Sequence, residues 1–172
     1  MSSPAHSELA LTSDQQQAAD AFADWLQQAD ATVPFVLSGF AGSGKTFLSM
    51  RLLQQVEARG LCWTVVAPTH KAVGVLRQAL ALEGLRPTWY PSTIHRLLRL
   101  KLKRQGDREL CESTEQTAAA LEHLGLVLID EASMVDSSLL AIALQCAHTF
   151  STRLVFVGSP LHLAQVLSQA FG

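Results

Sequence analysis

The sequence predicts an α/β fold in which a mostly parallel sheet is covered by helices on both faces. Short strands that are apolar on both faces alternate with helices of ten or more residues, a pattern typical of buried parallel sheets. A chain of 172 residues, 48% hydrophobic and 16% charged, is long enough for one such domain and too short for two. We therefore expect a flexible tail over residues 1–10 and one domain over residues 11–172.

Each element follows from apolar spacing and from the residues that flank it. Thr12 or Ser13 can cap a helix that runs to about Gln28, because apolar residues recur at helical spacing behind them. Pro34 precedes a short strand at 35–37, and a glycine-rich loop then leads into a helix from Lys45 to Ala58. The other expected elements are a strand at 62–68, a helix at 71–82, a helix at 114–123, a strand at 124–130, a helix at 137–147 and a strand at 153–158.

The loop GFAGSGKT, residues 39–46, has the pattern G-x-x-x-x-G-K-[ST] between a predicted strand and a predicted helix. Glycines let the backbone curl so that successive N–H groups point at phosphate oxygens, and the helix N-terminus adds to this field. The lysine reaches the β- and γ-phosphates and the threonine hydroxyl serves Mg²⁺. The residues assigned to ATP are Gly39, Gly42, Ser43, Gly44, Lys45 and Thr46, with Thr46 also assigned to Mg²⁺.

The second motif, LVLIDEAS, is acidic and places Asp130 and Glu131 at the end of an apolar strand. Ligands of open α/β sheets bind at the carboxyl ends of strands. We therefore expect Asp130 to orient the Mg²⁺ water shell and Glu131 to polarise an attacking water as a general base, with Lys45 completing the catalytic set.

Three further stretches, APTHKAVGVL at 67–76, STIHRLL at 92–98 and DEASMVD at 130–136, follow the phosphate loop in order. Together these motifs resemble the first RecA-like domain of the superfamily 1B DNA helicases, the group that contains the RecD-like enzymes, over roughly residues 11–158. The resemblance implies a RecA-like P-loop ATPase that couples ATP hydrolysis to translocation along single-stranded DNA. It also implies that Gln15 lies on the adenine edge. The DNA contacts that it implies are Pro68, Thr69, His70, Lys71, Thr93 and His95.

The segment RLLRLKLKRQGDR, residues 96–108, holds six of the thirteen basic residues of a chain whose net charge is −2. Leucines alternate with Arg99, Lys101 and Lys103, which suits the arm of a hairpin, and Gly106–Asp107 can form its turn. In the helicase family this interval carries a protruding β-hairpin that splits the duplex, so the expected partner is single-stranded DNA or its junction with a duplex. A solvated basic helix and loop is the alternative. Either arrangement attracts phosphates.

The resemblance weakens after the strand at 153–158. The family motif Gly-Asp-x-x-Gln-Leu-x-Pro-Val is replaced by GSPLHLAQV, with Ser159 for the acid and His162 for the glutamine. An altered or truncated reading frame and sequence divergence are both open. We expect no second RecA-like domain within residues 1–172, and such a domain normally brings arginines to the γ-phosphate. The chain alone should therefore turn ATP over very slowly, or act as a non-catalytic fragment that binds ATP and DNA.

Other classes fit less well. A GTP switch is excluded because its guanine-reading N-K-x-D motif needs Asn, which the chain lacks. A small kinase is disfavoured, since the one rich basic segment lies between the second DNA motif and the acidic pair. No cationic, apolar leader or long apolar run is present, so we expect a cytoplasmic protein without membrane contact. Trp25, Trp63 and Trp89 are expected to be packing residues and not platforms for base stacking, because no cluster of exposed aromatic residues is evident. Cys62 and Cys146 are expected to be small core residues.

Overall fold

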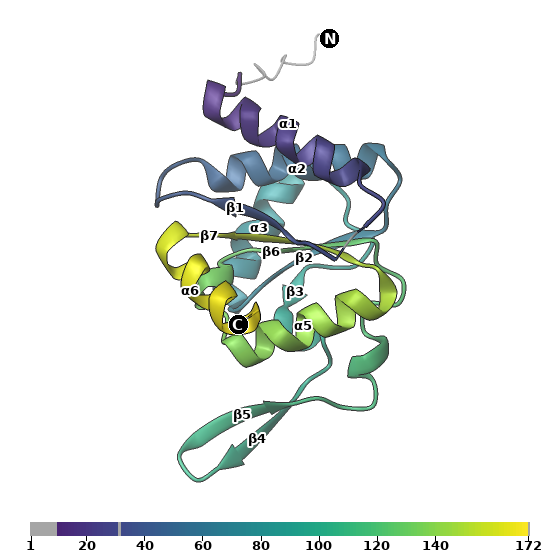
Figure 1. The fold of residues 1–172 in the computed structure, drawn as a ribbon, viewed down its shortest axis with the longest axis vertical. Helices are drawn as coiled ribbons and strands as arrows, with labels where there is room; N and C mark the ends of the chain where they lie inside the picture. The colour runs from purple at the N-terminus through teal and green to yellow at the C-terminus, as the bar shows by residue number, and fades with distance from the viewer. Residues whose placement is uncertain (1–9, 31, 172) are drawn as a thin grey trace.

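The computed structural model describes residues 10–30 and 32–171, so residues 1–9 of the expected tail lie outside the described residues. Its centre is a five-stranded parallel sheet in the order β1-β7-β6-β2-β3 (Figure 1). The strands are β1 (Phe35–Ser38), β2 (Trp63–Ala67), β3 (Ser92–Thr93), β6 (Leu126–Ile129) and β7 (Arg153–Gly158). The helices are α1 (Ser13–Gln27), α2 (Lys45–Ala58), α3 (His70–Leu82), α4 (Ile94–Leu97), α5 (Ser137–Phe150) and α6 (Pro160–Phe171), with 3₁₀ turns η1 (Thr117–Ala119) and η2 (Ala132–Met134).

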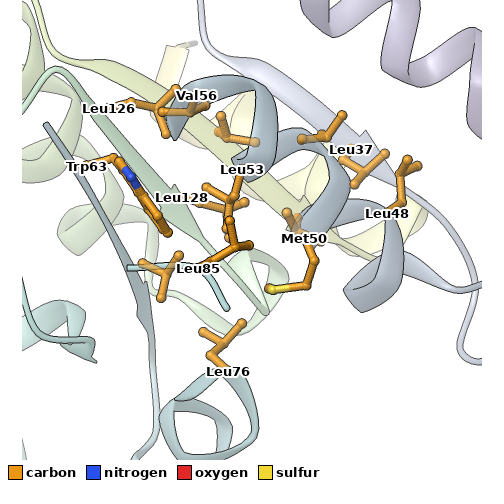
Figure 2. Packing of buried hydrophobic residues seen from close by; sticks show 14 of the residues in the cluster. Leu37, Leu48, Met50, Leu53, Val56, Trp63, Leu76, Leu85, Leu126 and Leu128 are labelled. Carbon is orange, nitrogen blue, oxygen red and sulfur yellow. The ribbon is translucent and has the colours of Figure 1, made fainter. Parts of the chain in front are cut away.

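Two hydrophobic cores flank the sheet, which confirms the predicted fold class. Helices α1 and α2 lie on one side of the sheet and α5 and α6 on the other (Figure 1). The strands alternate accordingly: Leu126 and Leu128 of β6 pack into the first core, whereas Val127 enters the second. Figure 2 shows the first core, where Trp63 and Leu128 meet side chains of α2 such as Leu53.

Local chemistry fixes the helix ends close to the predicted ones. Thr12 caps α1 through a reciprocal capping box with Gln15, whose backbone N–H bonds the threonine hydroxyl at 3.3 Å. Helix α2 has the predicted bounds, and α5 extends three residues past the predicted end to Phe150. Across the described ranges, no helix is long and apolar enough to cross a membrane.

The predicted helix at 114–123 is wrong, because only the 3₁₀ turn η1 forms there. The backbone N–H of Thr114 donates to the Thr117 hydroxyl at 2.8 Å, and the Thr114 hydroxyl donates to the Arg99 carbonyl at 2.9 Å. Such side-chain bonds compete with the helical ladder. Cys62, expected in the core, is exposed, whereas Cys146 is buried as predicted.

The segment after β7 forms helix α6, for which the sequence pattern predicted no element. Proline suits the first turn of a helix, where its missing N–H would have no partner. Leu163 is 1% exposed and packs in the second core with Val166 and Leu167 alongside it. The last segment is therefore part of the fold.

The insertion expected at about residues 96–112 contains an antiparallel hairpin, β4 (Lys101–Gln105) and β5 (Arg108–Glu112), that projects away from the sheet (Figure 1). Gly106, at φ 65°, makes the predicted turn together with Asp107. The predicted hairpin is confirmed and the helix–loop alternative is wrong.

Candidate nucleotide and nucleic-acid site

The phosphate loop and the acidic pair lie at the same edge of the sheet. Strands β1 and β6 run parallel to each other on either side of β7, so their carboxyl ends point the same way. The loop follows β1 and the acids follow β6. The backbone N–H of Gly39 donates to the Gly158 carbonyl at 3.2 Å, which ties the start of the loop to the end of β7.

The loop has the left-handed turns that its glycines permit. Gly42 and Gly44 have φ of 78° and 80°, where a side chain is strained. At Gly39 the limit is space, because a Cβ there would lie 2.5 Å from the Ser43 hydroxyl oxygen. The Lys45 ammonium donates to the Gly39 carbonyl and, at 2.9 Å, to the Phe40 carbonyl. The cation therefore folds back over the loop, ready to exchange these carbonyls for phosphate oxygens.

The surroundings of Asp130 raise the pKa of its carboxyl above the ordinary value. Burial raises the pKa of its carboxyl, and the charge of Glu131 raises it further, while the Glu131 backbone N–H at 2.9 Å and the Lys45 ammonium lower it. A carboxylate held this way gains from a nearby cation. Glu131 itself is exposed and has φ of 50°, a left-handed conformation that turns the chain from β6 into η2.

Gln15 lies beside the phosphate loop. It lines a hollow of about 280 Å³ together with Gly39, Ser43 and Lys45. A Cβ on Gly44 would lie 2.9 Å from the Gln15 side-chain nitrogen, so helix α1 contacts the loop directly. The Gln15 side-chain oxygen accepts from the Thr12 backbone N–H at 3.0 Å, which leaves the amide nitrogen facing the loop. The structure thus places Gln15 beside the phosphate loop, and its assignment to the adenine edge stays a prediction.

The two predicted DNA motifs meet in one hollow of about 540 Å³. Pro68 and His70 come directly after β2. Thr93 is the last residue of β3, the strand paired with β2 in parallel, and His95 lies in α4 just beyond it. Two of the assigned threonines also hold local structure: the Thr69 hydroxyl caps α3 and the Thr93 hydroxyl caps α4. Thr69 and Lys71 do not line the hollow, although they flank residues that do.

The predicted basic contacts of the hairpin lie elsewhere. Leu102 lines the same hollow, whereas Lys101 and Lys103 on either side of it do not. Lys103 pairs with Glu112 at 2.7 Å, and Arg104 lies 3.6 Å from Glu109. The hairpin is therefore less free to bind phosphate than its count of basic residues suggests.

Arg99 lines a different hollow, on the other side of the segment β3–α4, together with Trp89 and Tyr90. Trp25 and Trp63 are buried, as expected of packing residues, whereas Trp89 is 41% exposed. No periodicity in the sequence marked this pair of aromatic residues.

The departure from the helicase motif at residues 159–162 forms a small polar contact of its own. The Ser159 hydroxyl lies 3.1 Å from Nδ1 of His162, in the first turn of α6. This pair begins directly after Gly158, whose carbonyl holds the start of the phosphate loop.

Comparison with known proteins identifies the family. A family model described as an AAA domain matches residues 10–170. The chain belongs to this family. The match runs through α6, beyond residue 158, where we expected the likeness to end. The domain has the fold of the N-terminal ATPase domain of superfamily 1B helicases.

Solved structures and a curated relative show the same likeness. Bacteroides sp Pif1 in complex with ADP-AlF4 is 24% identical with a TM-score of 0.56, and covers 88% of this chain and 33% of that one. Bacteroides Pif1 bound to ssDNA is 23% identical with a TM-score of 0.56, and the match covers 88% of this chain and 32% of that one. An uncharacterized protein of Acanthamoeba polyphaga mimivirus is 28% identical over 77% of this chain and 29% of its own length. The chain thus spans about a third of these proteins or less.

Proposed function

We propose that this chain is an ATP-binding motor domain of a DNA helicase, which couples ATP hydrolysis to translocation along single-stranded DNA when the rest of the motor is present. The observation that carries the proposal is the shared sheet edge. The phosphate loop, the acidic pair and the hollow between the two DNA motifs all follow the carboxyl ends of parallel strands of one sheet. Nucleotide and nucleic acid would therefore bind on one side of the fold.

The nucleotide site fits ATP with Mg²⁺. The Lys45 ammonium is satisfied by loop carbonyls alone and can turn to phosphate, while the buried Asp130 carboxyl gains from a cation. Thr46 and Asp130 would hold Mg²⁺, which neutralises charge that develops on the phosphates. Glu131 would orient and polarise the attacking water, and Gln15 would read the adenine edge.

Two observations support the assignment of a DNA site: the hollow between the two motifs, and the likeness to Pif1 helicases. Pro68, His70, Thr93 and His95 offer backbone, hydroxyl and imidazole groups to a nucleic-acid backbone, which positions a strand without reading its sequence. The related Bacteroides Pif1 is bound to ssDNA in its solved structure. We propose single-stranded DNA or its junction with a duplex as the partner, and the cytoplasm as the location.

Steady-state ATP hydrolysis with and without oligothymidine tests this proposal. A DNA-stimulated rate that is lost in Glu131→Gln, while ATP binding is retained, supports a working motor domain. A second candidate function, binding of ATP and DNA without turnover, is favoured by Ser159 and His162 at the positions of the family's acid and glutamine. A flat baseline in the wild type, with DNA and ATP both bound, would select this second function. Failure to bind ATP would contradict both.

We propose that residues 11–172 form one domain and that the arginines which speed hydrolysis come from a further RecA-like domain. Such an arginine is typically worth about 10³–10⁵ in rate. We therefore expect slow hydrolysis and no unwinding from these 172 residues alone. Single-turnover unwinding by the purified chain would contradict this expectation.

A further inference from the structure

A second groove runs along the edge of the sheet formed by β3, outside the site described above. It consists of two hollows, of about 420 and 570 Å³, which share Arg77, Tyr90 and Pro91 in their walls. The first also contains Trp89, Arg96 and Arg99, and the second contains Arg86. We name this the arginine–aromatic groove.

The charge of the groove is uniformly positive. Its walls hold Arg77, Arg86, Arg96 and Arg99, all exposed, and no carboxylate is among the residues that line it. In the part of the chain that the structure describes, none of these arginines forms an ion pair. A protein with a net charge of −2 thus concentrates unpaired cations on one short path. Such a path attracts a polyanion.

The aromatic residues of the groove are placed for stacking. Tyr90 is 76% exposed even though the Arg77 guanidinium covers one face of its ring at 4.3 Å, so the opposite face is open. Arg77 is held there by a hydrogen bond to the Pro91 carbonyl at 2.7 Å. Trp89 is anchored by its backbone, because its carbonyl accepts from the buried Thr64 hydroxyl at 2.8 Å. A ring supported by a guanidinium, a second exposed ring on an anchored backbone, and neighbouring cations are the elements of a single-strand stacking platform.

The groove is separate from the hollow assigned to DNA, yet adjoins it. Ser92 lines the groove and Thr93 lines the other hollow, because neighbouring residues of a strand point to opposite sides. The same division continues in α4, where Arg96 lines the groove and His95 lines the hollow. The segment β3–α4 therefore separates the arginine–aromatic groove from the hollow assigned to DNA, just before the projecting hairpin.

We propose that the arginine–aromatic groove binds a second single-stranded segment of nucleic acid, with a base stacked on Tyr90 and Trp89 and phosphates held by Arg96 and Arg99. This inference rests on the proposed function, since it assigns a further path for the same partner. A phosphate-rich ligand without bases would contact the arginines but would not stack on the rings of Tyr90 and Trp89. Stacking therefore distinguishes a nucleic acid from a simple polyanion.

Intrinsic fluorescence reports on the groove directly. The chain has three tryptophans, of which Trp25 and Trp63 are 6% and 2% exposed and Trp89 is 41% exposed. Oligothymidine that enters the groove should quench Trp89, and the quenching should disappear in Trp89→Phe. Inorganic polyphosphate should bind without quenching. Equal quenching by polyphosphate would overturn the stacking proposal.

Binding of fluorescein-labelled oligothymidine, followed by anisotropy, gives the energetic test. Tyr90→Ala should weaken binding about 5- to 150-fold, the range for losing one stacked base. Tyr90→Phe keeps the ring and should bind like the wild type, and it covers the case in which Tyr90→Ala fails to fold. Leu82→Ala is the matched control, since Leu82 is 75% exposed on α3 and lies outside the groove. Arg96→Ala should lower the salt dependence of oligothymidine binding by about one phosphate contact. Arg59→Ala is the control and should not change it, because Arg59 is exposed at the end of α2 and lies outside the groove.

The outcomes separate this inference from the proposed function. Anisotropy that rises while Trp89 stays unquenched, or a Tyr90→Ala protein that binds like Leu82→Ala, would overturn the groove and leave the helicase proposal standing. No anisotropy change in the wild type would overturn both. Quenching that depends on Trp89 and binding that depends on the Tyr90 ring would support the groove.

Discussion

Replacing Gly158 with alanine probes the point where the phosphate loop, the acidic motif and helix α6 meet. Gly158 ends β7, and its carbonyl accepts the Gly39 N–H. A Cβ at this position would lie 3.1 Å from Cγ of Leu163 and 3.2 Å from both the backbone nitrogen and the hydroxyl oxygen of Ser133. The φ of Gly158 is not left-handed, so the effect of the substitution is steric and not conformational.

The size of the effect follows from what must move. The Ser133 nitrogen is backbone and belongs to the turn η2 after the acidic pair, and Leu163 is fully packed. Overpacking of this kind costs about 1–3 kcal/mol. For a chain of this size each kcal/mol lowers Tm by about 2–4 °C, so we expect Gly158→Ala to melt about 2–12 °C below the wild type. Since η2 would shift, the protein should also bind Mg²⁺-ATP less tightly.

Circular dichroism melting and urea unfolding measure this change, with Gly74→Ala as the matched control. Gly74 lies inside α3, and a methyl group added to it would meet no atom within 4 Å, so alanine there should stabilise the helix by about 0.5–1 kcal/mol. Leu163→Ala removes the Cγ that Gly158→Ala would strike. The double variant should therefore be more stable than the sum of the single changes implies. A Gly158→Ala protein as stable as the wild type, or strict additivity with Leu163→Ala, would refute the reasoning.

Three further predictions concern the site and its support. Lys45→Ala should abolish the thermal stabilisation by ATP, which for the wild type at one hundred times Kd is about 2.7 kcal/mol, or a Tm increase of about 5–11 °C; a surviving shift would contradict the phosphate-site assignment. Because burial raises the pKa of Asp130 in the folded protein, the stability it contributes is present below its unfolded pKa and is lost as pH rises through the raised value. Asp130→Asn, which cannot ionise, should therefore exceed the wild type in unfolding free energy at neutral pH but not in acid, as urea titrations across pH would show. Thr152→Val should cost about 1–3 kcal/mol, because the buried Thr152 hydroxyl donates to the Leu124 carbonyl at 2.8 Å, whereas Thr149→Val at an exposed position of α5 should cost less in the same assay.

The sequence was informative where local chemistry decides the structure. The phosphate loop needs glycines at fixed positions, because Gly42 and Gly44 adopt left-handed backbone conformations that glycine tolerates without strain. The alternation of leucine with basic residues predicted the hairpin, because period-2 patterning and a Gly-Asp turn are both local signals. The fold class followed for the same reason, since apolar strands and helices of the right length alternate along the chain.

The sequence failed where distant contacts decide. Residues 114–123 have helical spacing, but Thr114 bonds to Arg99 and Thr117, and the tertiary contact overrides the pattern. The arginine–aromatic groove draws Arg77 from α3, Tyr90 from the loop before β3 and Arg99 from the segment after α4. These residues come together only because the chain from 88 to 93 runs beside β2, which no periodicity shows.

The candidate nucleotide site and the hollow assigned to DNA are joined by a short and continuous piece of chain. Asp130 begins it at the nucleotide edge, where its backbone N–H donates to the Val66 carbonyl at 2.9 Å, and Val66 lies two residues before Pro68 in the DNA hollow. The chain then turns at Glu131, passes through η2 and reaches Asp136, which lines the DNA hollow and caps α5 through the Ser138 N–H at 2.8 Å. Close packing transmits strain from one part of such a turn to the next. A change in the position of Asp130 on binding a cation would therefore reach the hollow assigned to DNA by two routes, one through the hydrogen bond to Val66 and one through η2 to Asp136. Along the second route, the movement would begin at the left-handed turn of Glu131.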